Sequence, residues 1–136
     1  MNPKYSSFTE THPHTNDHFS RSQKSFLNLA MKTAEASECT QRHGAVVVKS
    51  GSVLSIGLNK WRNNAALADE LFAAGKSTDI SVHAEIDALS RVRNPAGAVL
   101  YIARVNKQGE PMMSKPCNGC AKAIEEAGIT KVIYTS

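Results

Sequence analysis

The chain is poor in the residues on which several large classes of protein depend. Its 136 residues include only three cysteines, one tryptophan, three tyrosines and four phenylalanines. Three cysteines in a chain of this size argue against a disulfide framework. The longest apolar run, from Ala98 to Ala103, is far too short to cross a membrane. The formal net charge of +4 is weaker than the basic surface of a dedicated nucleic-acid binder.

The first twenty residues lack the apolar segments that would indicate a folded element or a signal peptide. Residues 1–20 are polar, show no hydrophobic periodicity and contain no apolar segment of the kind found in signal peptides, so we expect a cytoplasmic protein. Three histidines in this stretch could bind metal, but the composition favours a flexible tail. With 41% apolar residues, the remainder is long enough to bury a core. We therefore expect a tail at 1–20 and one domain at 21–136.

After residue 20 the hydrophobic pattern predicts helices that alternate with short buried strands. A helix at 21–38 begins with a capping box formed by Ser20 and Gln23, and a hairpin follows with its turn at Ser50-Gly51. This alternation predicts an α/β layer sandwich with parallel strand pairing near the end of the chain. The further expected elements are an irregular stretch at 59–80 with a short helix near 65–74, a helix at 82–92, a strand at 99–103, a helix at 118–127 and a strand at 131–134.

Two short motifs carry most of the chemistry. The first is His83-Ala84-Glu85 and the second is Pro116-Cys117-Asn118-Gly119-Cys120. One imidazole and two thiolates supply three ligands, as in a catalytic zinc site that keeps its fourth position for water, whereas four protein ligands close a structural site. Glu85 would remain free to take a proton from that water.

The C-x-x-C pair also occurs in sites of other kinds. One alternative is a redox dithiol. The C-x-x-C motif of a redox dithiol follows the first strand near the N-terminus, whereas this pair lies near the C-terminus. A structural zinc would need a fourth ligand, and neither Cys39 nor His43 belongs to a pair with ligand spacing. We expect His43 to be structural or exposed. A non-enzymatic zinc module stays open as an alternative, although such a site has no need of Glu85.

Helix starts would bring the motif residues together. Cys117 and Cys120 are three positions apart and share one face of a helix. His83 and Glu85 are two apart and would point away from each other in the middle of a helix. They can meet at one metal only if His83 lies at the edge of its helix, and Ser81 is the expected N-cap.

The motifs and the order of elements resemble the cytidine deaminase superfamily over residues 21–136. The segments 116–124 and 127–129 are most similar to deoxycytidylate deaminases, while 83–89 and 44–48 are shared more broadly, including with tRNA adenosine deaminases. The resemblance implies a three-layer sandwich in which a mixed sheet of four to five strands lies between helices. It also implies one Zn²⁺ per chain, hydrolytic deamination and a homo-oligomer.

The resemblance assigns roles to individual residues. His83, Cys117 and Cys120 would bind the Zn²⁺, and Glu85 would be the catalytic acid and base. Three substrate-binding candidates are Asn59 for the sugar, the backbone N–H of Ala84 for the base, and Trp61 for stacking. Asn59 could also be an ordinary turn residue, and Trp61 could equally pack internally or lie in an interface.

The sequence departs from the family pattern in three places. Gly57-Leu58-Asn59-Lys60 stands where deoxycytidylate deaminases usually have Gly-Tyr-Asn-Gly, part of an allosteric nucleotide site, so allosteric control is in doubt. The two motifs are further apart than usual because 106–110 adds a turn. After the strand at 131–134, the family's last strand and helix are expected to be shortened or missing.

The function expected first is hydrolytic deamination of a free cytosine nucleoside or nucleotide, with a uracil product and ammonia. The partner would then be a small molecule, and no membrane is involved. The alternative is a polynucleotide-editing deaminase acting on a flipped base in single-stranded DNA or RNA, including enzymes similar to tRNA adenosine deaminases. Nucleic acid is the less favoured partner because basic and aromatic residues are not interleaved, although the basic loop around Trp61 keeps this alternative open.

Overall fold

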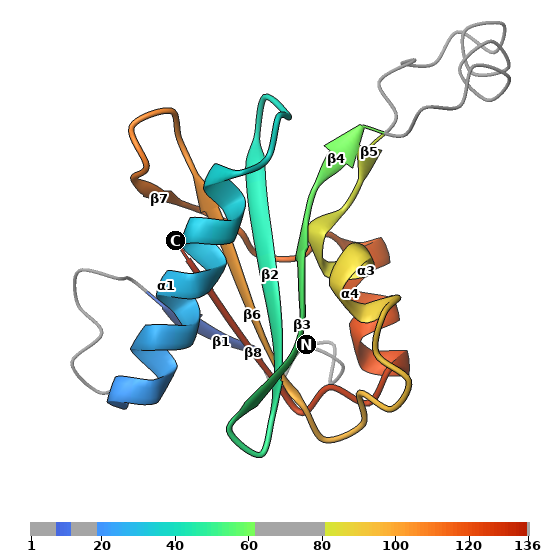
Figure 1. Cartoon of the computed structure of the whole chain (residues 1–136). Coiled ribbons are helices and arrows are strands. Elements are labelled where there is room, and N and C mark those ends of the chain that lie inside the picture. Colours follow the sequence, from blue (N-terminus) through green and yellow to red (C-terminus); the bar gives the residue numbers. More distant parts are fainter. Residues whose placement is uncertain (1–7, 12–18, 62–80, 136) are drawn as a thin grey trace, which may run out of the picture.

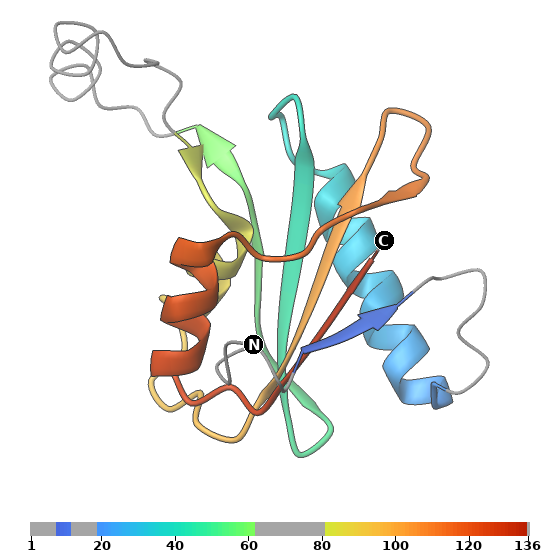
Figure 2. The same ribbon diagram turned by 180° about the vertical axis from the view of Figure 1, so that it is seen from behind.

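The computed structural model describes residues 8–11, 19–61 and 81–135. A central sheet is covered by one helix on one face and by two helices on the other (Figures 1 and 2). The expected three-layer α/β sandwich is therefore confirmed. The strands are β1 (Phe8–Thr11), β2 (Arg42–Lys49), β3 (Ser52–Leu58), β4 (Lys60–Trp61), β5 (Ser81–Val82), β6 (Val99–Val105), β7 (Pro111–Met112) and β8 (Lys131–Thr135), and the helices are α1 (Arg21–Glu35), α3 (Ala84–Leu89) and α4 (Asn118–Glu126).

The sheet is mixed. Its order is β1-β8-β6-β2-β3, with the short β7 paired to β6 beside this path. β2 runs antiparallel to β3 and to β6, whereas β8 runs parallel to both β6 and β1. The parallel pairing predicted near the end of the chain is confirmed, and α4 makes the crossover from β6 to β8.

Two local sequence signals produce the predicted structure. Ser20 caps α1: its hydroxyl accepts from the N–H of Gln23 at 3.1 Å, and the Gln23 side chain accepts from the N–H of Ser20 at 2.9 Å. The β2–β3 hairpin turns at Ser50 and Gly51, whose φ angles of 52° and 79° are typical of a two-residue type I′ turn. The predicted capping box and hairpin are both confirmed.

The apolar run of β2 is buried on both faces, because successive side chains of a strand point to opposite sides. Ala45 and Val47 belong to the core under α3 and α4. Val46 and Val48 belong to the core under α1. One continuous apolar strand thus supplies both interfaces of the sandwich.

Two glycines let the helices lie directly on the sheet backbone. A Cβ on Gly57 would come within 2.5 Å of the nitrogen of Ala88 and 2.6 Å of the carbonyl oxygen of Ala84, both in α3. A Cβ on Gly44 would clash in the same way with the backbone of α1. The distance from α3 to the sheet is therefore fixed by backbone contact rather than by adaptable side chains.

Several features differ from the sequence predictions or add to them. β1 lies inside the segment expected to be a tail, and pairs in parallel with β8 from Phe8↔Val132 to Thr11↔Thr135. A turn is present at 106–110, where the N–H of Asn106 donates to the carbonyl oxygen of Glu110 at 3.0 Å. The short helix predicted near 65–74 lies outside the described residues.

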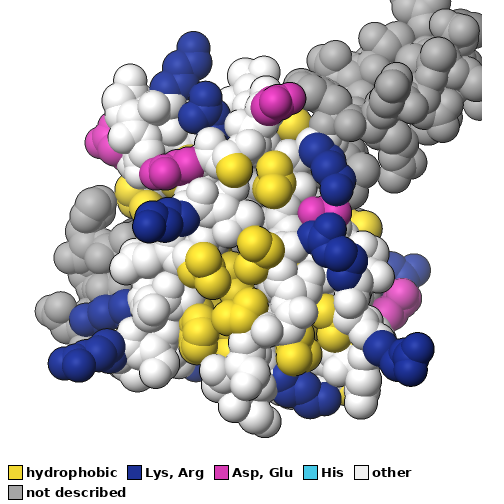
Figure 3. Space-filling model, in the orientation of Figure 1, with side chains coloured by type: hydrophobic (Ala, Val, Ile, Leu, Met, Phe, Trp, Pro, Cys, Tyr) yellow, Lys and Arg dark blue, Asp and Glu magenta, His cyan; other side chains and the backbone are white. Residues whose placement is uncertain are grey.

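The outer strand β3 exposes apolar side chains. Val53, Leu54 and Ile56 are between 43% and 45% exposed, and Ile86 of α3 is 37% exposed. Figure 3 shows apolar side chains gathered on this side of the molecule, with Lys and Arg around them. Contiguous apolar surface of this kind is common at protein interfaces, but the homo-oligomer stays a prediction. Among the described helices, none has the length and apolar character needed to span a bilayer.

Candidate active site

The site is built where α3 and α4 begin. The N-cap of α3 is His83, with φ −71° and ψ 146°, and the N-cap of α4 is Cys117, with φ −68° and ψ 167°. Both are in extended conformation, so each side chain projects ahead of its helix. The prediction that His83 lies at the edge of its helix is confirmed. The predicted N-cap Ser81 is wrong, because Ser81 is extended in β5, where it pairs with Trp61.

The structure brings the three predicted ligands together. Nδ1 of His83 lies 3.1 Å from Sγ of Cys120 and 4.0 Å from Sγ of Cys117. All three donor atoms lie within 4.8 Å of one another. Tetrahedral zinc with bonds of about 2.0–2.3 Å needs ligand atoms roughly 3.5–3.8 Å apart. The three side chains could therefore hold a metal ion with small adjustments.

The electrostatics of the group favour a cation. Burial raises the pKa of the Cys120 thiol well above its usual value, and the neighbouring Glu85 and Cys117 raise it further. Without a positive charge, this sulfur stays protonated. A divalent cation reverses the preference, because thiolate is the ligand form. One imidazole nitrogen and two soft sulfurs suit Zn²⁺.

The group has three members, with no fourth among the described residues. Cys39 and His43 line the same cavity but do not belong to the ligand group. His83 and Cys117 are exposed, so the donor atoms can be reached from solvent. A three-ligand group with an accessible side corresponds to a catalytic metal site rather than to a closed structural one.

A cavity of about 570 Å³ lies beside the ligand group. This volume is within the range of sites that enclose small molecules. His83, Cys117 and Glu85 are among the residues that line the cavity. The other residues that line the cavity are Cys39, Thr40, Gln41, His43, Asn59, Ala84, Ser114 and Lys115.

Glu85 and Ala84 face this cavity from the first turn of α3. Glu85 is only 5% exposed and lies outside the metal-ligand group, so its carboxylate is available for proton transfer. Ala84 is completely buried. Its backbone N–H belongs to the first helical turn, where amide groups have no acceptor within the helix.

Asn59 lines the cavity and also fixes the ends of two strands. Its Oδ1 accepts from the N–H of His43 at 2.8 Å, and its Nδ2 donates to the carbonyl oxygen of Gln41 at 2.5 Å. An amide has two hydrogens and two oxygen lone pairs, so one of each remains for a ligand. Of Trp61 the structure describes the backbone, which pairs with Ser81, and its predicted stacking role stays a prediction.

His43 is a cavity residue that the sequence analysis did not select. Burial lowers its pKa, with Arg104 and His83 acting in the same direction, whereas Glu85 and a hydrogen bond to the backbone of Gln41 partly offset this. The imidazole is therefore neutral at neutral pH. The hairpin gives no simple signal for this position: counting back from the turn at Ser50-Gly51 places His43 opposite Leu58. The register shift between Val47 and Val48 moves it next to Asn59.

The loop that leads into Cys117 is fixed by a buried polar contact. Ser114 is 3% exposed, its hydroxyl lies 2.8 Å from Oγ1 of Thr135, and its N–H donates to the carbonyl oxygen of Thr135 at 2.9 Å. This ties the loop to the end of β8. Lys115 follows on the loop as an exposed cation at the cavity.

The chain is similar in sequence to a known protein family. Residues 20–136 match the family described as the cytidine and deoxycytidylate deaminase zinc-binding region. The chain belongs to this family. A deoxycytidylate deaminase of Enterobacteria phage T2 is 27% identical over 79% of the chain and 76% of its own length.

Solved structures of deaminases have the same fold. The dCMP deaminase of cyanophage S-TIM5 in its apo form has a TM-score of 0.60, with 26% identity over 82% of this chain and 80% of its own. The same phage enzyme in complex with dCMP and dUMP has a TM-score of 0.58, with 22% identity over 86% of this chain and 83% of its own.

Proposed function

We propose that the chain is a zinc-dependent hydrolytic deaminase of a free cytosine nucleoside or nucleotide, most similar to deoxycytidylate deaminases. The observation that carries the proposal is the position of Glu85. A buried carboxylate that is not part of the ligand group stands beside a three-ligand metal site, in one cavity. A purely structural zinc would have no use for it.

Each chain residue has a defined task in this reaction. His83, Cys117 and Cys120 would hold Zn²⁺, which when bound acidifies water and supplies the nucleophile for C4 of the cytosine ring. Glu85 accepts one proton of the water and delivers it to N3. It then transfers the second proton to the exocyclic amine, which leaves as ammonia as the C4–N bond breaks. Water and cytosine thus give uracil and ammonia.

Three observations support a small substrate. The cavity has the volume of a small-molecule site. Asn59, Ala84 and Lys115 line it: the amide of Asn59 suits a sugar hydroxyl, the backbone N–H of Ala84 would suit a base, and Lys115 offers a positive charge for a phosphate. The related T2 protein is named for deoxycytidylate, and the related cyanophage enzyme is bound to dCMP and dUMP.

The proposal is tested by ammonia release from zinc-loaded protein. The compounds are deoxycytidine, dCMP, dCTP, adenosine, guanine and a cytosine-containing single strand, each assayed across a salt series. We expect dCMP to be favoured, with weak salt dependence because one phosphate releases few counterions. A strong preference for the strand, with affinity falling steeply as salt rises, would establish the polynucleotide-editing alternative instead.

A further inference from the structure

Lys60 contacts both ends of the segment that carries Glu85. Its backbone pairs with Val82 in the short β4–β5 ladder, directly before His83. Its Nζ lies 3.0 Å from Oδ1 of Asp87, two residues after Glu85. Because Lys60 also follows Asn59 in the chain, it joins the proposed substrate-binding amide to the helix that carries the proposed acid and base.

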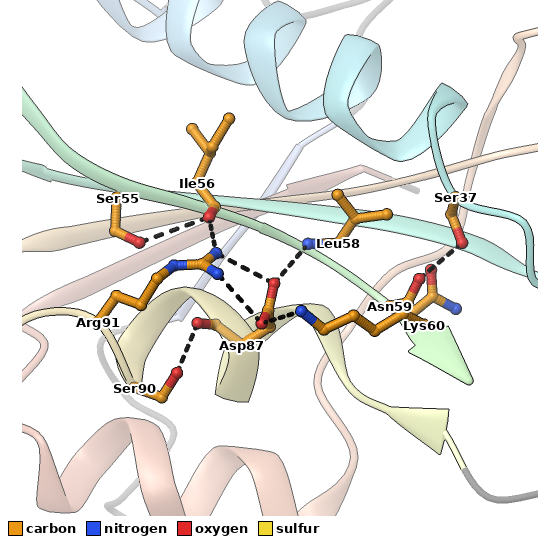
Figure 4. A network of polar contacts seen from close by, with 9 residues as sticks. All are labelled: Ser37, Ser55, Ile56, Leu58, Asn59, Lys60, Asp87, Ser90 and Arg91. Carbon is orange, nitrogen blue, oxygen red and sulfur yellow. Dashed lines mark hydrogen bonds and ion pairs between the residues drawn. The ribbon is translucent and has the colours of Figure 1, made fainter. Parts of the chain in front are cut away.

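Asp87 is the buried partner in this contact. Its side chain is 8% exposed. Besides Lys60, it accepts from the N–H of Leu58 at 3.2 Å and from the guanidinium of Arg91 at 3.1 Å. Figure 4 shows its carboxylate between α3 and β3, with these donors around it. Asp87 does not line the cavity, so it can influence a substrate only through its neighbours.

Asn59 is held from the other side by residues that precede β2 or begin it. The hydroxyl of Ser37 donates to the carbonyl oxygen of Asn59 at 2.8 Å, and the N–H of Asn59 donates to the carbonyl oxygen of His43 at 3.2 Å (Figure 4 for Ser37). The segment Asn59–Lys60 is therefore fastened on one side to β2 and on the other side to Asp87 in α3.

Granting the proposed deamination, we propose that Asp87 is a positioning residue for it. Through Lys60, the Asp87 carboxylate fixes the Asn59–Lys60 segment against α3. The amide of Asn59 and the carboxylate of Glu85 then keep constant positions relative to each other while a substrate binds between them. Asp87 contributes to substrate affinity without touching the substrate.

Arg91 offers a matched comparison with Lys60. Both cations contact the same carboxylate, and their side chains are similarly exposed, at 51% and 53%. Arg91 makes its second contact with the carbonyl oxygen of Ile56, in the body of β3 and away from Asn59. Loss of Arg91 should loosen α3 on the sheet, whereas loss of Lys60 should release the substrate-binding segment.

The test compares Lys60→Met, Arg91→Met, Asp87→Asn and the double variant Lys60→Met/Asp87→Asn in the zinc-loaded protein. Zinc content, thermal midpoint, kcat and KM are measured with dCMP and with deoxycytidine. We expect Lys60→Met and Asp87→Asn each to raise KM at least about threefold for both compounds, with a smaller change in kcat. The double variant should add no further increase, and Arg91→Met should lower the thermal midpoint while KM stays the same.

Three results would overturn the proposal. An unchanged KM in Lys60→Met would show that the ion pair has no role in binding. A KM increase for dCMP alone would mean that Lys60 itself contacts the phosphate, and in that case Asp87→Asn, which frees Lys60, should lower the KM for dCMP. An equal KM increase in Arg91→Met would show that any loosening of α3 has the same effect.

A second readout does not depend on enzymatic activity. Trp61 follows Lys60 and is the only tryptophan, so its time-resolved fluorescence anisotropy reports on this segment in the free protein. We expect faster local motion in Lys60→Met and Asp87→Asn but not in Arg91→Met.

Failure of the proposed function and failure of this inference give different results. If the wild-type protein deaminates no cytosine compound, the proposed function fails. Motion that is the same in all variants would instead overturn the coupling of Asp87 to this segment.

Discussion

Nδ1 of His83 lies 3.1 Å from Sγ of Cys120, although 37 positions separate the two residues in the chain. The contact exists because α3 and α4 lie on the same face of the sheet and begin at the same end of it (Figure 2). The ligand group therefore depends on the packing of the whole layer and not on either motif alone. Metal binding and folding should be coupled in this protein.

The first prediction concerns the metal. Cys120→Ala should lose zinc and unfold at a lower temperature, because a bound metal stabilises the folded state. Cys39→Ala is the matched control, since Cys39 is a buried cysteine of the same cavity that lies outside the ligand group. It should keep its zinc. Elemental analysis and thermal denaturation of both variants are the measurements, and full zinc in Cys120→Ala would contradict the assignment.

The second prediction separates chemistry from metal binding. Glu85→Gln keeps the size of the side chain but removes the group that carries the proton. Zinc content and thermal midpoint should be retained, while turnover should fall by about 10²–10⁴-fold. Glu126→Gln, an exposed position in α4, should leave all three quantities unchanged. Near-normal turnover in Glu85→Gln would rule out the proposed mechanism.

The third prediction concerns acid stability. Burial alone would raise the pKa of Asp87, but the Lys60 ammonium, the Leu58 N–H and the Arg91 guanidinium outweigh it and hold the pKa below the usual 3.8. The folded-state pKa is thus below that of the unfolded chain. The ionised carboxylate stabilises the fold fully above about pH 4, and this contribution is lost as the pH falls through the folded-state pKa.

Asp87→Asn should accordingly have a lower thermal midpoint than the wild type at neutral pH. The difference between the two proteins should shrink as the pH is lowered from about 7 toward 3, because acid removes the same charge from the wild type. Thermal denaturation across this range is the measurement. A difference that stays constant or grows in acid would show that the charge of Asp87 does not stabilise the fold.

The fourth prediction concerns the contact between α3 and the sheet. Gly57→Ala places a methyl group against the backbone of Ala84 and Ala88 and should destabilise the fold by about 1–3 kcal/mol. Since α3 would move, zinc should also be lost more readily to a chelator. Gly119→Ala is the control: apart from its chain neighbours and its own helix backbone, the added Cβ has no described atom within 4 Å, and alanine favours the helix. It should be at least as stable as the wild type.

Local signals made much of the fold predictable. Ser20 and Gln23 identify the start of α1, Ser50-Gly51 identifies the hairpin, and Gly128, with φ 83°, directly follows the C-cap Ala127 of α4. The three candidate metal ligands were likewise predictable, because a metal needs particular side chains at particular spacings. Each of these features is encoded within a few neighbouring residues.

Features that depend on distant partners were not predictable in the same way. β1 has the polar sequence Phe-Thr-Glu-Thr and forms a strand only because β8 offers it a free edge. His83 rather than Ser81 caps α3 because the β4–β5 ladder keeps Ser81 extended. The contact between Lys60 and Asp87 likewise joins two residues that are far apart in the sequence. None of these pairings leaves a periodic or compositional trace.

Asp87 and Arg91 also form hydrogen bonds with backbone groups at the outer edge of the sheet. Among the described strands, β3 lies at one end of the sheet order, and an open strand edge is a template for edge-to-edge association with another chain. The N–H of Leu58 is already bound to Asp87, and the carbonyl oxygen of Ile56 to Arg91. These two backbone groups are therefore not free to pair with a foreign strand, and the two charged side chains reduce the length of β3 that is open to edge-to-edge association.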